Sequence, residues 1–249
     1  MFKENIEDKV IIVIGATGSL GSELCKCLVQ INTNVIITYH KKYEYAKELE
    51  FIFSKKGKKC YLINCDITNE ISIKNMIEKV IKIYHKIDVL INIAGVAIDC
   101  PIALMKLSSW NRVININLTG VYLCCKYVLK KMIPKRQGKI INIGSYKGIV
   151  VEKGQANYCV SKAGIIALTR TMAKEIGQYN ISINTICPGF VQTNLNDIND
   201  SALKHAKESS YMSIEYNLKD MINFILFMIS DAMRGVSGQV FCLGSRIMD

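Results

Sequence analysis

Proline, tryptophan and histidine are scarce in this chain, and long apolar runs are absent. Among 249 residues there are three prolines, one tryptophan and three histidines. The longest apolar candidates, Val10–Ile14 and Met221–Ile229, are much too short to cross a bilayer. The charged segment 1–9 lacks the apolar centre of a secretory signal. We therefore expect a cytoplasmic protein without a membrane partner, and we find no linker or internal repeat that would divide it.

Cysteine is plentiful, with ten residues, but no Cys-x-x-Cys pair occurs. None of the histidines stands at ligand spacing from a cysteine, so the pattern does not indicate a metal site. Most of the cysteines lie in apolar segments such as Val121–Cys125, where a free thiol behaves as a small hydrophobic group. We expect reduced core thiols and no bound metal.

The formal net charge is +11, and the lysines that produce it are scattered. They do not form a single run with interleaved aromatic residues, which argues against a nucleic-acid partner. An anionic cofactor, substrate or protein partner would be attracted by the same field.

Short apolar runs alternate with longer segments of helical period along the whole chain. The runs are nearly continuous in apolar residues, which is typical of parallel strands buried on both faces. Six alternations predict a single α/β domain over residues 1–249, with a doubly wound, seven-stranded, mostly parallel sheet of Rossmann type and helices on both faces. The strands are expected at Val10–Ile14, Val35–Tyr39, Cys60–Cys65, Val89–Ile93, Lys139–Ile143, Ile181–Ile186 and Gln239–Leu243, and the helices near Gly18–Gln30, Tyr43–Ser54, Ile71–Tyr84, Ser109–Met132, Ala156–Gly177 and Leu218–Ser230.

A glycine-rich turn directly follows the first predicted strand and opens the first helix. Glycines in such a turn let the backbone amides approach a pyrophosphate, which then faces the helix N-terminus. Alone the pattern is weak, but here it starts a strand–helix–strand unit. The turn consists of Gly15, Ala16, Thr17, Gly18, Ser19, Leu20 and Gly21.

The end of the second predicted strand carries positive charge instead of an acid. An acidic side chain there would bind the two ribose hydroxyls of NAD and repel a 2′-phosphate. The sequence places His40, Lys41 and Lys42 at this point, with no acid before Glu44. The segment favours NADP(H), although lysines of this kind can also simply solvate a helix start.

Four polar side chains form a candidate catalytic group. Asn117 interrupts the apolar face of a long predicted helix, and Ser145 follows the fifth strand. Tyr158 and Lys162 are one helical turn apart, so the phenol and the ammonium share a face. A nearby ammonium lowers the pKa of a phenol, which can then exchange protons near neutral pH, while a serine opposite stabilises charge on a substrate oxygen.

With these motifs, the chain resembles the classical short-chain dehydrogenase/reductases. Within that family it is most similar to the β-ketoacyl-acyl-carrier-protein reductases of fatty-acid synthesis. The similarity runs from about Lys9 to Thr193 and resumes near Leu218. Besides the residues above, it is carried by the motifs Asn92–Gly95, Trp110–Asn117, Gly154–Tyr158 and Pro188–Thr193.

The resemblance implies a role for each site residue. Tyr158 donates a proton to the substrate carbonyl oxygen, Lys162 holds the nicotinamide ribose and tunes Tyr158, Ser145 orients the carbonyl, and Asn117 positions a water. Asp66 and the backbone of Ile67 meet the adenine. With the turn and the basic segment, the expected cofactor contacts are Gly15, Thr17, Gly18, Ser19, Leu20, Gly21, His40, Lys41, Asp66, Ile67, Asn92, Ala94, Gly95, Tyr158, Lys162, Pro188, Gly189, Val191 and Thr193.

The chain departs from the family pattern in regions that concern substrate and assembly. Residues 194–217 match poorly and correspond to a substrate lid, and the C-terminal segment Val240–Ser245 lacks the usual acid and second glycine. The resemblance implies a homo-oligomer, either a tetramer or a dimer.

The sequence thus predicts an NADP-dependent oxidoreductase that reduces a carbonyl to a secondary alcohol. The favoured substrate is a 3-oxoacyl thioester on acyl carrier protein or coenzyme A, because the positive charge suits an acidic carrier and Lys135–Arg136 lies where relatives dock it. Two alternatives stay open: reduction of another carbonyl or oxidation of another alcohol, such as a secondary metabolite, polyol or steroid, and a non-catalytic nucleotide sensor. The filled catalytic positions argue against the sensor.

Overall fold

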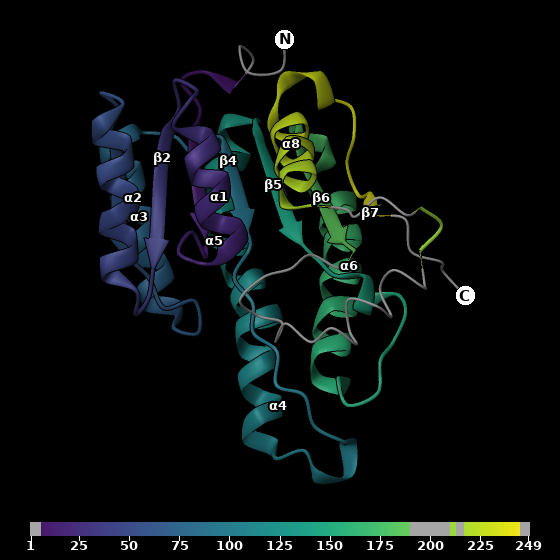
Figure 1. Cartoon of the computed structure of the whole chain (residues 1–249). Helices are drawn as coiled ribbons and strands as arrows, with labels where there is room; N and C mark the ends of the chain where they lie inside the picture. Colours follow the sequence, from purple (N-terminus) through teal and green to yellow (C-terminus); the bar gives the residue numbers. More distant parts are fainter. Residues whose placement is uncertain (1–5, 190–209, 213–216, 245–249) are drawn as a thin grey trace.

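Seven parallel strands form one sheet in the order β3-β2-β1-β4-β5-β6-β7 (Figure 1). The computed structural model describes residues 6–189, 210–212 and 217–244. From β1 the chain moves outward to β3 and then returns to β4 on the other side of β1, which makes the sheet doubly wound. The strands are β1 Val10–Ile14, β2 Asn34–Tyr39, β3 Cys60–Asn64, β4 Val89–Asn92, β5 Gly138–Ile143, β6 Ile181–Pro188 and β7 Val240–Leu243.

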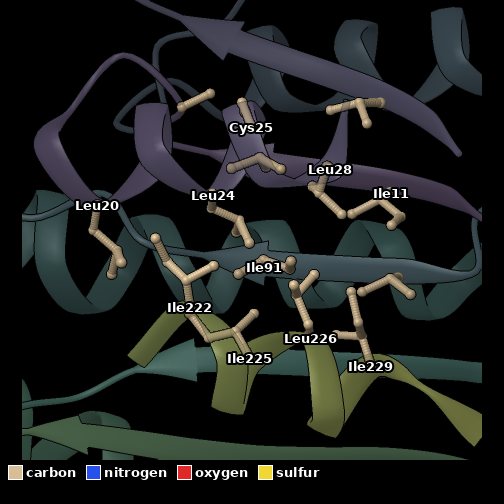
Figure 2. Packing of buried hydrophobic residues seen from close by; sticks show 14 of the residues in the cluster. Ile11, Leu20, Leu24, Cys25, Leu28, Ile91, Ile222, Ile225, Leu226 and Ile229 are labelled. Atoms are coloured by element: carbon tan, nitrogen blue, oxygen red, sulfur yellow. The ribbon is translucent and has the colours of Figure 1, made fainter. Parts of the chain in front are cut away.

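Helices cover both faces of this sheet (Figure 1). One apolar cluster joins α1, α2 and α8 to one face, and a second joins α3, α5 and α6 to the other. Figure 2 shows the first cluster, in which Leu24 of α1 and Ile225 of α8 lie on either side of Ile91. The α-helices are α1 Ser19–Leu28, α2 Tyr43–Lys55, α3 Glu70–Tyr84, α4 Leu107–Ile114, α5 Gly120–Met132, α6 Ala156–Ile176 and α8 Leu218–Ile229.

The burial of the strands explains why the apolar runs predicted them. Every residue of β1, β4 and β5 is buried, as expected for strands with a helix layer on each side. The edge strands β3 and β7 are largely half-buried or exposed. The predicted fold class is confirmed, and each predicted strand is present with ends that differ by at most two residues.

One predicted helix contains a turn of a different type. The stretch predicted near Ser109–Met132 is helical throughout, and it consists of α4, a π-helical turn over Asn115–Thr119, and α5. In this turn the Gly120 N–H bonds to the carbonyl of Asn115, five residues earlier. The wider turn has no composition signature, so hydrophobic period alone could not reveal it.

All ten cysteines are free, and six of them are buried, in agreement with the expected core thiols. Across the described residues, none of the helices combines the length and apolar character that a membrane span needs. The predicted lid, 194–217, lies mostly outside the described residues.

Candidate active site

The glycine-rich turn packs tightly at the carboxyl ends of β1 and β4. Gly15 has φ +85°, and a Cβ there would come within 2.7 Å of the Ala94 backbone nitrogen. A Cβ at Gly21 would overlap the Gly15 carbonyl oxygen. Side chains at these two positions would therefore push the turn away from β4.

The same turn leaves the N-terminus of α1 open to an anion. Gly18 is the N-cap residue of α1, and it has no side chain that could cap the first turn. Backbone amides at such a terminus carry partial positive charge and bind phosphate. The packed turn and the uncapped helix together fit the pyrophosphate of a dinucleotide, with Thr17, Ser19 and Leu20 contributing backbone along the cradle.

Basic and acidic side chains meet at the carboxyl ends of β2 and β3. His40 and Lys41 are exposed, and they are close enough to Asp66 to affect its pKa. Partial burial raises that pKa, but hydrogen bonds from Thr68 and the charges of His40 and Lys41 outweigh it, so the pKa of Asp66 lies below its usual value. The Asp66 carboxylate accepts bonds of 2.9 and 2.7 Å from the Thr68 amide and hydroxyl. His40, Lys41 and Asp66, which are all predicted cofactor contacts, are thus neighbours in the structure.

Asn117 lies in the π-helical turn and is fully buried. Its Oδ1 accepts a 2.8 Å bond from the Val96 amide, and its Nδ2 donates to the Val96 carbonyl at 2.9 Å and to Ser161 Oγ at 3.1 Å. Both amide protons are therefore engaged, and a water at Asn117 would have to donate to the second lone pair of Oδ1. Asn117 and Lys162 both approach Gly95, where a Cβ would lie 3.5 Å from Oδ1 and 3.7 Å from Nζ.

Tyr158 and Ser145 meet between α6 and the end of β5. The Ser145 hydroxyl is close enough to the Tyr158 phenol to act on its pKa, which it lowers. Ser145 Oγ also accepts a 3.1 Å bond from the Lys147 amide, which fixes the hydroxyl at the start of the turn after β5. The pair places a proton donor beside a hydroxyl that can share a substrate oxygen.

Lys162 is buried beneath Tyr158, with 4% of its surface exposed. Its Nζ donates a 2.8 Å bond to the Ile143 carbonyl and lies 5.7 Å from the centre of the Tyr158 ring. Burial lowers the pKa of Lys162 to about 8 and, as the largest effect, raises the pKa of Tyr158. The expectation that the ammonium lowers the pKa of the phenol is therefore not met in this structure, because loss of solvent around the phenol outweighs the effects that lower its pKa.

Comparison with known proteins places this arrangement in a family. The model of the short chain dehydrogenase family matches residues 9–204. The chain belongs to this family. It is 35% identical to the 3-oxoacyl-[acyl-carrier-protein] reductase FabG of Thermotoga maritima over 94% of this chain and 96% of that protein. It is 31% identical to the reductase of the same name from Aquifex aeolicus, over 94% and 95%.

Solved structures agree with this assignment. The protein gox2181 superposes with a TM-score of 0.91 at 25% identity, covering 98% of this chain and 97% of that one. A variant of a Serratia marcescens short-chain dehydrogenase/reductase gives 0.89 at 22% identity, over 96% and 97%, and shows the fold. As a short-chain dehydrogenase, the chain is an oxidoreductase, and members of its family use nicotinamide cofactors.

The remaining predicted contacts of this short-chain dehydrogenase lie at the ends of β4 and β6. Gly189 follows Pro188 and donates a 2.6 Å backbone bond to Leu243 in β7. Val191 and Thr193 lie outside the described residues. Asn92 does not present its side chain at a surface: it is buried, and its Nδ2 donates a 2.8 Å bond to Asn142 Oδ1 in β5. Asn92 thus joins β4 to β5 beneath the site.

Several supporting residues were missed by the sequence reasoning. Asn142, which accepts the bond from Asn92, donates a 2.9 Å hydrogen bond to the Thr169 hydroxyl of α6. The Thr169 hydroxyl in turn accepts a 2.8 Å hydrogen bond from Thr185 of β6. Asn157 donates to the Ile98 carbonyl at 3.0 Å, which ties the segment after β4 to the start of α6. Polar residues within apolar runs were the available signal, since a buried polar side chain needs a partner.

Proposed function

We propose that the chain catalyses the NADPH-dependent reduction of a carbonyl to a secondary alcohol, and that its substrate is a 3-oxoacyl thioester on acyl carrier protein or coenzyme A. One observation carries the proposal: a half-buried phenol lies close to the Ser145 hydroxyl and to the Lys162 ammonium, at the strand ends beside the glycine-rich turn that opens α1. The names of the two bacterial relatives, both 3-oxoacyl-[acyl-carrier-protein] reductases, support the substrate.

In this mechanism Tyr158 is the general acid, and Ser145 orients the substrate oxygen. The raised pKa keeps the phenol protonated at neutral pH, so it can give its proton to the carbonyl oxygen as negative charge develops there. The Ser145 hydroxyl, which lies close to the phenol, directs its one proton to the same substrate oxygen and stabilises the developing charge. NADPH, when bound along the glycine-rich turn, would supply the hydride for the carbonyl carbon.

Lys162 and Asn117 hold the surrounding groups in place. We propose that the Lys162 ammonium binds the nicotinamide ribose and offsets the charge that forms on Tyr158 when its proton leaves. Asn117 fixes the segment after β4 through its two bonds to Val96 and keeps one oxygen lone pair for a water.

Two features support NADP(H) rather than NAD(H). The basic residues His40 and Lys41 follow the end of β2, where a 2′-phosphate would lie. Asp66, the nearby acid, is hydrogen-bonded to Thr68 and lies close to these basic residues, so it does not project a free carboxylate towards the phosphate.

An acidic carrier protein fits the positive charge of the chain, and we propose that it docks near Lys135 and Arg136. Both residues are exposed after α5. Arg136 is held by a 2.7 Å bond to the Gln178 carbonyl and lies over the Tyr179 ring at 5.8 Å. A preorganised guanidinium loses less freedom when it binds an anion.

A panel of carbonyl substrates assayed with NADPH and NADH in parallel tests this proposal. The panel contains acetoacetyl-coenzyme A, a polyol-derived ketone and a steroid ketone. We expect the thioester to be reduced fastest, and NADPH to be used better than NADH. Rapid reduction of the other ketones with no thioester turnover would remove the acyl assignment, and a faster rate with NADH would contradict the role of His40 and Lys41.

A further inference from the structure

Two cysteines face each other across strands β6 and β7, at the edge of the candidate active site. Cys187 and Cys242 are direct register partners in this parallel pair. Register partners in neighbouring strands have Cα atoms roughly 4.8 Å apart, within the range of about 4.4–6.8 Å that a disulfide spans. The two thiols are close enough to act on each other's pKa, so they lie on the same side of the strand pair.

The sulfur of Cys187 also lies next to the backbone just before Ser145. Alternate residues of a strand lie on the same face of the sheet, so Cys187 and Thr185 share a face. The Thr185 hydroxyl is hydrogen-bonded to Thr169 of α6, so this is the face that α6 covers. The Ser145 backbone is close enough to the Cys187 sulfur to lower its pKa. A Cβ added to Gly144 would come within 2.7 Å of the same sulfur, which shows how closely the backbone before Ser145 lies against it. Cys187 therefore supports the backbone that positions Ser145.

We propose that Cys187 and Cys242 form a modification site at which hydrogen peroxide closes a disulfide and thereby lowers the activity of the enzyme. Cys242 is half-buried and Cys187 is fully buried, so Cys242 meets the oxidant first. Its sulfur attacks the peroxide: an S–O bond forms, the O–O bond breaks, and one water leaves. The Cys187 sulfur then attacks the Cys242 sulfenic acid, an S–S bond replaces the S–O bond, and the released hydroxide takes the Cys187 proton as a second water.

The disulfide changes the site because one sulfur serves both contacts. In the reduced chain Cys187 Sγ lies against the backbone of Gly144 and Ser145. Once bonded to Cys242, this sulfur is drawn towards β7 and its contact with Ser145 is weakened. A displacement of the serine backbone relative to Tyr158 is costly, since small misplacements of catalytic groups lower rates strongly.

Burial sets the conditions under which the pair reacts. It raises the pKa of Cys187 to about 12 and also raises that of Cys242. Both thiols are therefore protonated at neutral pH and react slowly, because the thiolate is the nucleophile. The pair is thus a response to sustained oxidant, not to a brief pulse.

The first test is chemical and does not depend on the substrate. The full chain is incubated with excess hydrogen peroxide, then alkylated, digested and analysed by mass spectrometry. We expect a species that has lost two hydrogen atoms and contains a linked Cys187–Cys242 peptide, reversed by dithiothreitol. Absence of this linkage, or preferential linkage of other cysteines, would overturn the proposal.

The second test is functional and rests on the proposed function. Peroxide should lower kcat about tenfold, as expected for a displaced catalytic group, with recovery after dithiothreitol. The C242S variant should have the activity of the reduced wild type and resist peroxide. C60S is the matched control, because Cys60 is half-buried on the opposite edge strand, and it should stay sensitive. If no carbonyl is turned over, NADPH affinity is measured before and after oxidation. Equal activity or affinity in the linked and reduced chains would refute the regulatory role even where the disulfide forms.

Discussion

Burial shifts the pKa values of Tyr158 and Lys162 in opposite directions, and both shifts bear on the direction of catalysis. The phenol stays protonated, which suits an acid that gives its proton to a carbonyl oxygen. The lysine, with a pKa of about 8, is the first of the two to lose its proton as the pH rises. Above this pH Lys162 is neutral, and its charge no longer offsets that of a Tyr158 phenolate.

The lysine pKa predicts a pH profile. We expect kcat/KM for NADPH to fall as the pH rises through about 8, because this parameter reports the ionisations of the free enzyme. Below that pH Lys162 is cationic and the phenol protonated, so the rate should be flat. A K162R variant keeps its charge over this range, and its remaining activity should lose the decline near pH 8. The same decline in K162R would assign the ionisation to another group.

The cofactor preference depends on another single residue. We expect K41A to raise KM for NADPH about tenfold, the value of one charge-assisted hydrogen bond, with little change for NADH. K56A is the control, since Lys56 is an exposed cation just after the other end of α2. Steady-state kinetics with both cofactors measure this difference. Equal losses with NADPH and NADH would show that Lys41 acts through the fold instead of the 2′-phosphate.

For single residues, the sequence could predict which side chains form the candidate site, but it could not predict the burial or the hydrogen-bond partners of each one. The spacing of Tyr158 and Lys162 correctly put them on one face of α6, near each other. It could not show that Lys162 would be buried and Tyr158 half-buried, and so it gave the wrong direction for the phenol pKa. Nor could it show that Thr68, two residues after Asp66, engages the acid. Burial and partners depend on segments far apart in the chain.

Among the elements, the π-helical turn between α4 and α5 has the clearest consequence for the site. It places Asn117 against Val96 and Ser161, and it brings Gly120 against the segment after β3. A Cβ at Gly120 would lie 2.8 Å from the Ile67 carbonyl oxygen, at a predicted adenine contact. The close approach therefore requires glycine.

A substitution here tests that packing. We expect G120A to lower the free energy of unfolding by about 1–3 kcal/mol through overpacking, and to weaken NADPH binding because Ile67 must move. G177A is the matched control: a Cβ at Gly177 meets nothing within 4 Å and its φ is −56°. That variant should be as stable as the wild type or slightly more so. Urea unfolding measures both; equal stability of the two variants would contradict the packing.

The elements themselves were largely predictable because their signals are local. Val10–Ile14 and Lys139–Ile143 are apolar or β-branched runs, and both became strands at those positions. The π-helical turn within Ser109–Met132 was not predictable, because a local shift in hydrogen bonding by one residue leaves the apolar period almost unchanged.

For the molecule as a whole, buried thiols dominate the alkaline side of its stability. Burial raises the pKa of seven cysteines, whereas it lowers the pKa of two lysines, Lys139 and Lys162, to about 8. Above pH 9 the unfolded chain releases thiol protons that the folded chain retains, which favours unfolding. The lowered pKa values of the two lysines make the free energy of unfolding rise with pH over this range, but there are fewer such lysines than thiols. The cysteines are Cys25, Cys60, Cys65, Cys124, Cys125, Cys187 and Cys242.

We therefore expect the free energy of unfolding to fall as the pH rises from about 9 to 11. Urea titrations in the presence of a reductant measure it. C25A removes one fully buried thiol, so its stability should fall less steeply with pH, by up to about 1.4 kcal/mol per pH unit. A stability that rises over this range would show that the lysines outweigh the thiols.

The central claim is that Tyr158 supplies the proton for hydride reduction at this site, and the Y158F variant tests it most directly. NADPH affinity and the rate of reduction of the best carbonyl are measured on the same preparation. The account predicts a kcat at least about a hundredfold lower, with NADPH affinity unchanged, because the ring and its packing remain. A Y158F enzyme that reduces its substrate at the wild-type rate would contradict the account.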